Sequence, residues 1–109
     1  MSLRLQYTSV INALAGQGQW EAAMTMLDDM TKVCSEKPTI GTYCAVMDAC
    51  GNGGEWEKAL GIYRSLEGSR FDTSSRSFNS LIKALEKGGQ SQLAESISRE
   101  RSMFGKKST

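Results

Sequence analysis

The chain has 109 residues, 39% of them apolar, and a formal net charge of +1, which allows one small domain and excludes a strongly basic or strongly acidic protein. Three cysteines without a histidine exclude a disulfide-dense secreted scaffold, a zinc-type ligand set and a Cys–His nucleophile. No apolar run approaches the roughly 20 residues that a membrane-spanning helix needs.

The first third of the chain contains two helical patterns. Apolar residues between Tyr7 and Leu14 recur at the i, i+3, i+4, i+7 spacing of one helix face, which predicts a helix over 5–16. A second apolar stripe begins at Trp20 and predicts a helix over 19–32. Gly18 lies between them, and glycine is favoured just past a helix end because that residue often needs a positive φ. We therefore expect an antiparallel helical hairpin.

The middle third repeats this arrangement. Pro38 and Thr39 suit the start of a helix over 40–51, because a proline ends the preceding helix. The glycine-rich stretch 51–54 then precedes a helix over 55–67. Such glycines either cradle a phosphate at a helix N-terminus or form a hairpin corner. The G-x-x-x-x-G-K-[ST] pattern is absent and no strand-like segment precedes them, so the sequence predicts a corner.

The last third again predicts two helices, over 75–87 and 91–102, with a corner at Gly88-Gly89. Where the preceding unit has large apolar side chains on its second helix, this unit has Ser91, Glu95, Ser98 and Arg101. A polar face of this kind is typical of a terminal repeat, which has no following unit to cover. Residues 75–109 are therefore predicted to form a degenerate, cap-like unit.

The three thirds are related by an internal repeat. Trp20-Glu21 and Trp56-Glu57 lie 36 residues apart, and the next interval is 35. A self-similar period of this size indicates stacked helical hairpins. The sequence thus predicts a single all-α domain over 1–109, a helical-hairpin solenoid of three repeats of about 35 residues. The predicted repeats are 4–39, 40–74 and 75–109.

The repeat unit resembles the pentatricopeptide repeat. The shared features are an aromatic-led first helix, a glycine corner and a second helix of the form W-E-x-A-[LM]-x-[ILM]-[LY]-x-x-[LM], and the resemblance runs from Arg4 to the C-terminus. It implies a right-handed solenoid whose first helices line a concave face. It also implies a non-catalytic protein of mitochondria or plastids that binds single-stranded RNA, with one base per repeat read by two or three side chains.

The resemblance further implies which side chains meet the RNA. In this family the residue after the first-helix aromatic reads the base together with the last residue of the repeat. The first readers are then Thr8, Cys44 and Asn79, and their partners are Thr39, Ser74 and Thr109. The position that sandwiches bases holds Leu5, Gly41 and Arg76, and the position that contacts phosphate holds Gly16, Asn52 and Lys87. Lys83 adds a further positive charge.

Two functions stay open on the sequence. Residues 1–69 carry a net charge of −3 and residues 70–109 a net charge of +4, which permits a polyanion contact at the C-terminal end but is also typical of an ordinary solvated surface. The family resemblance favours RNA binding, weak for the chain alone. Against this, Cys44 places a weakly hydrogen-bonding thiol at a reader position, and Leu3 and Leu5 begin the chain without a polar cap. The alternative is a structural adaptor, with no cofactor or small-molecule substrate, in a large organellar assembly such as a ribosome or a photosynthetic or respiratory complex.

Overall fold

The computed structural model describes residues 3–33, 38–67 and 75–107, and all its regular elements in these ranges are helices. The helices are α1 Leu3–Gly16, α2 Trp20–Val33, α3 Ile40–Asn52, α4 Trp56–Glu67, α5 Ser75–Lys87 and α6 Ser91–Lys107. The sequence predicted each of them. The largest difference is at the end of α6, which continues past the predicted residue 102 to Lys107.

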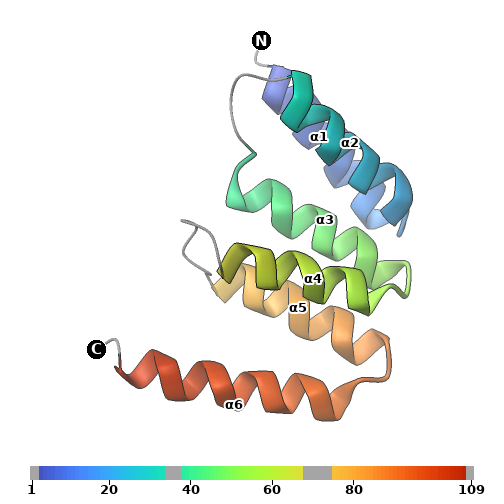
Figure 1. Ribbon diagram of the computed structural model, residues 1–109. Coiled ribbons are helices and arrows are strands. Elements are labelled where there is room, and N and C mark those ends of the chain that lie inside the picture. Colours follow the sequence, from blue (N-terminus) through green and yellow to red (C-terminus); the bar gives the residue numbers. More distant parts are fainter. Residues whose placement is uncertain (1–2, 34–37, 68–74, 108–109) are drawn as a thin grey trace.

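The six helices form three antiparallel hairpins that stack in chain order (Figure 1). Helix α3 packs between α1 and α5, so that the first helices of the three hairpins form a continuous layer. Each second helix also packs on the first helix of the next hairpin, α2 on α3 and α4 on α5. The described part measures 41 × 31 × 17 Å. This confirms the predicted stack of helical hairpins.

The three corners share one backbone geometry. Gly18, Gly54 and Gly89 have φ values of 69°, 82° and 74°, a region that costs a residue with a Cβ about 1–2 kcal/mol. The N–H of the residue after each glycine donates to the carbonyl five residues before it, namely Gln19 to Leu14, Glu55 to Cys50 and Gln90 to Leu85. This Schellman arrangement satisfies carbonyls that the helix end leaves open. The glycines of 51–54 therefore end a helix, and the corner interpretation is confirmed.

Tryptophan side chains join each hairpin to the next. Trp20 lies against Gly53 at the second corner, and Trp56 lies against Gly88 at the third, so closely that a Cβ on either glycine would overlap the indole ring. Both tryptophans are half-buried and pack against the core. Ser91 takes the equivalent position in α6. The two indoles are thus structural anchors between repeats. A half-buried junction suits an indole, because its apolar ring can pack while its N–H stays near solvent.

The first hairpin exposes a face that the other two bury. Val10 is 44% exposed, whereas Val46 and Leu81, at the same position of the next two repeats, are fully buried. The preceding hairpin covers α3 and α5 on that side, and no hairpin of the described chain covers α1. Leu3 and Leu5 are exposed on the same helix. The apolar edge expected at the start of the chain is therefore present.

Candidate nucleic-acid interface

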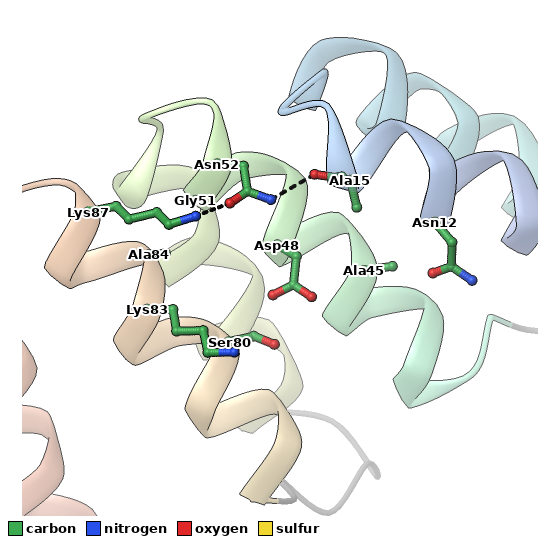
Figure 2. A pocket seen from close by; sticks show the side chains of 11 residues that line it. Asn12, Ala15, Ala45, Asp48, Gly51, Asn52, Ser80, Lys83, Ala84 and Lys87 are labelled. Carbon is green, nitrogen blue, oxygen red and sulfur yellow. Dashed lines mark hydrogen bonds between the residues drawn. The ribbon is translucent and has the colours of Figure 1, made fainter.

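Helices α1, α3 and α5 together line a groove with a volume of about 330 Å³ (Figure 2). Its floor consists of small residues, Ala15, Gly16, Ala45, Gly51 and Ala84. Its walls carry polar or charged side chains, Asn12, Asp48, Asn52, Ser80, Lys83 and Lys87. Small floor residues let the helices approach closely, and a Cβ on Gly51 would lie only 2.8 Å from the Ala84 Cβ. The first helices of the hairpins line one groove, as the resemblance implied.

One face of α5 supplies the two lysines that line this groove, Lys83 and Lys87. Arg76, Asn79, Lys83 and Lys87 are spaced by three, four and four residues and are all exposed. That spacing places them in one line along the helix. These four were predicted as RNA contacts, and the structure brings them together as a stripe along the third repeat. We call this set the α5 stripe.

A chain of hydrogen bonds crosses the groove at its corner end. Asn52 donates from Nδ2 to the Ala15 carbonyl at 2.8 Å, and its Oδ1 accepts from the Lys87 ammonium (Figure 2). The predicted phosphate-contacting position thus holds a structural amide in the second repeat. Lys87 has three donors in all, so its ammonium can still meet an anion.

The threonines predicted as readers use their hydroxyls within the protein. The Thr8 hydroxyl donates to the Arg4 carbonyl at 2.8 Å, and its oxygen lies 3.2 Å from the hydroxyl oxygen of Thr42. The Thr42 side chain is fully buried. Thr39 is the N-cap of α3, and its hydroxyl oxygen accepts from the Thr42 N–H at 3.3 Å. An N-cap of this kind stabilises a helix by about 1 kcal/mol. Both hydroxyls therefore have structural partners already.

Cys44 is placed differently from the expectation that it faces the groove, because its side chain is fully buried. Gly41 lies one turn earlier on the same helix. A Cβ on Gly41 would lie 3.5 Å from Arg76 Nη1, so the guanidinium of the next repeat lies beside the position that the glycine leaves empty. Because its side chain is fully buried, the second predicted reader is not open to a ligand. Ser74 and Thr109 lie outside the described residues.

The structure also identifies groove residues that the sequence reasoning missed. These are Asn12 and Asp48, which line the groove and occupy one repeat position with the predicted Lys83, four residues after the readers. The available signal was the i+4 spacing, which keeps a side chain on the same helix face. Asp48 points into the groove (Figure 2), and none of the described residues forms a hydrogen bond or ion pair with its carboxylate.

Cys44 and Cys50 are free, buried thiols. Burial raises the pKa of both, and raises that of Cys50 to about 11. Because only the thiolate reacts with an alkylating reagent, we expect both residues of the folded chain to react with iodoacetamide at pH 8 roughly tenfold or more slowly than in urea. Mass spectrometry of a Cys34→Ser variant measures the rates. Equal rates in the folded and unfolded chain would contradict the burial.

The described part of the chain also bears on metal binding and membrane insertion. Within it, no group of three or more Cys, Asp or Glu side chains is arranged to hold a metal ion. None of the helices there has the length and apolarity needed to cross a membrane.

Comparison with known proteins gives family matches over most of the sequence. A family model described as pentatricopeptide repeat domain matches residues 5–53. A second, described as PPR repeat, matches residues 41–71 and 76–97. None of the curated proteins compared with the chain matches it. The matched segments contain all three corners, Trp20 and Trp56.

Proposed function

Since the chain belongs to the pentatricopeptide repeat family, whose members are helical-repeat modules that typically bind RNA or proteins, we propose that it is a non-catalytic module that binds single-stranded RNA. The groove between α1, α3 and α5 receives the strand, and the α5 stripe makes most of the phosphate contacts. General family association supports a location in a mitochondrion or plastid, which imaging of the tagged chain in cells tests.

The α5 stripe is the observation that carries this proposal. Arg76, Lys83 and Lys87 place three positive charges on one exposed helix face beside the groove, and phosphate neutralisation by such side chains supplies most of the affinity of sequence-independent binding. Asn79 adds an exposed amide that can bond a base edge. Since the readers of the first two repeats are engaged or buried, binding by the chain alone is expected to be weak.

Removing two charges of the α5 stripe tests the proposal. For the double variant Lys83→Ala/Lys87→Ala, we expect the affinity for an oligouridine to fall about three- to tenfold at low salt. The slope of log affinity against log salt should shrink by about 1.4, because each single-strand phosphate contact contributes about 0.7. Fluorescence anisotropy at several salt concentrations measures both quantities.

The matched control removes two positive charges elsewhere. In the double variant Lys32→Ala/Arg99→Ala, both residues lie outside the groove and pair with acidic neighbours on their own helices, Asp28 and Glu95. This variant should keep the wild-type slope. If the two double variants weaken binding equally, the proposal that RNA contacts the α5 stripe is wrong. If the wild-type chain binds no RNA at low salt, the proposed function itself is wrong.

The second candidate is a structural adaptor in a large organellar assembly, and the exposed apolar edge of α1 favours it. Leu5 is 57% exposed and Val10 44%, and both are apolar side chains of α1 that a protein contact would bury. RNA binding in the groove does not explain why these apolar side chains of α1 are exposed. Stoichiometric co-purification of the chain with a large complex, abolished by Leu5→Glu/Val10→Glu, would support the adaptor.

A further inference from the structure

We propose that Asp48 recognises a guanine base of the bound strand, with its carboxylate accepting two hydrogen bonds from the Watson–Crick edge. This inference rests on the proposed RNA binding and adds a base preference to it. It concerns the second repeat, where the predicted reader Cys44 is closed to any ligand by its burial.

The position of Asp48 makes it available to a base. It lies one helical turn after Cys44 on the same face of α3, and it is half-buried in the wall of the groove. Figure 2 shows its carboxylate pointing into the space between α1 and α5. No described residue holds this carboxylate in a hydrogen bond or ion pair. A carboxylate with both oxygens unused is therefore presented to whatever occupies the groove.

The chemistry of a carboxylate selects one base among the four. Two oxygens side by side accept two parallel hydrogen bonds and donate none. Guanine presents two adjacent donors, N1–H and the N2 amino group, on its Watson–Crick edge. Adenine, cytosine and uracil each present a single donor group there, next to at least one acceptor that a carboxylate repels. Unstacked bases of single-stranded RNA are commonly read on this edge.

The surroundings of Asp48 fit a purine. The alanines and glycines that line the groove have no large side chains and so leave room for a ring, and the volume of about 330 Å³ is within the range of ligand sites. Lys83 occupies the equivalent position on α5 and lines the same groove, so it supplies a donor for the guanine O6 acceptor. Its charge also offsets the repulsion between Asp48 and the RNA phosphates.

The test varies one base and one carboxylate. The probe is a labelled oligouridine with a single central guanosine, inosine, adenosine or cytidine, titrated with the full chain at low salt. We expect guanosine to bind about tenfold more tightly than adenosine or cytidine, as one bidentate contact implies. Inosine keeps N1–H but lacks the N2 amino group, so it should fall between them.

Asp48→Asn removes the second acceptor and the charge. We expect its guanosine preference to fall below about twofold, while its affinity for plain oligouridine stays equal or rises because one negative charge has left the groove. Asp29→Asn is the matched control, an identical change at an exposed residue of α2 outside the groove, and it should keep the preference. Circular dichroism checks that both variants fold.

The outcomes separate the two proposals. Equal binding of all four probes by the wild-type chain, or an unchanged guanosine preference in Asp48→Asn, overturns the role of Asp48 and leaves RNA binding standing. Absence of binding to every probe at low salt overturns both. A guanosine preference that only Asp48→Asn removes supports the inference.

Discussion

Replacement of Val46 by alanine is expected to lower the free energy of unfolding by about 2 kcal/mol and the melting temperature by about 8 °C. Val46 is fully buried, and it lies one turn after Thr42, whose hydroxyl meets Thr8 of α1. The spacing places Val46 on the face of α3 that packs on α1, so the substitution removes two methyl groups there and leaves a cavity. Thermal and urea unfolding followed by circular dichroism measure the loss.

Val10→Ala is the control, since it makes the same chemical change at the same position of the first repeat. Val10 is 44% exposed, so little buried area is lost, and alanine is the better helix former by up to about 0.7 kcal/mol. We expect no loss of stability, or a small gain. Equal destabilisation by the two substitutions would contradict the stacking of the first hairpin on the second.

Two glycine-to-alanine substitutions are expected to change stability in opposite directions. Gly51→Ala should lower the free energy of unfolding by about 1–2 kcal/mol, because the new Cβ would lie 2.8 Å from the Ala84 Cβ and 3.0 Å from its Cα, and α3 and α5 must move apart. Gly61→Ala should raise it by up to about 1 kcal/mol, because alanine is the better helix former and nothing lies within 4 Å of the new methyl group.

The pair is informative because both glycines are helical and neither has a positive φ. The difference between their changes in unfolding free energy therefore measures how closely α3 packs on α5, and not a strained backbone. Parallel urea titrations of the two variants measure this difference. Stabilisation by Gly51→Ala would mean that α3 and α5 are farther apart than the structure shows.

The sequence predicted the helices well because each carries a local signal. Apolar spacing identified every helix, and the corner glycines marked where the first helix of each hairpin ends, which the positive φ of Gly18, Gly54 and Gly89 confirms. The anchoring role of Trp20 and Trp56 was also predictable, since a polar residue replaces them in the last unit. The right-handed course of the stack is implied only by the family, and it stays a prediction.

The groove was less predictable, because what reaches its surface depends on contacts between repeats. No local pattern shows that Gly41 leaves room for Arg76, a residue 35 positions later, or that Cys44 becomes buried. The hydroxyls of Thr8 and Thr39 meet through Thr42, which a motif for RNA readers does not include. Asp48 was missed for the opposite reason, since an isolated acidic residue on a helix usually faces solvent.

The tryptophan anchors also give the protein an optical property. The chain has only two tryptophans, and each lies at a different junction, Trp20 against the second corner and Trp56 against the third. Indole fluorescence therefore reports on both junctions, and a single Trp→Phe replacement leaves the signal of one. In a linear array, stability is the sum of unit and neighbour terms, so the two single-tryptophan proteins let the strength of each junction be read separately without any added label.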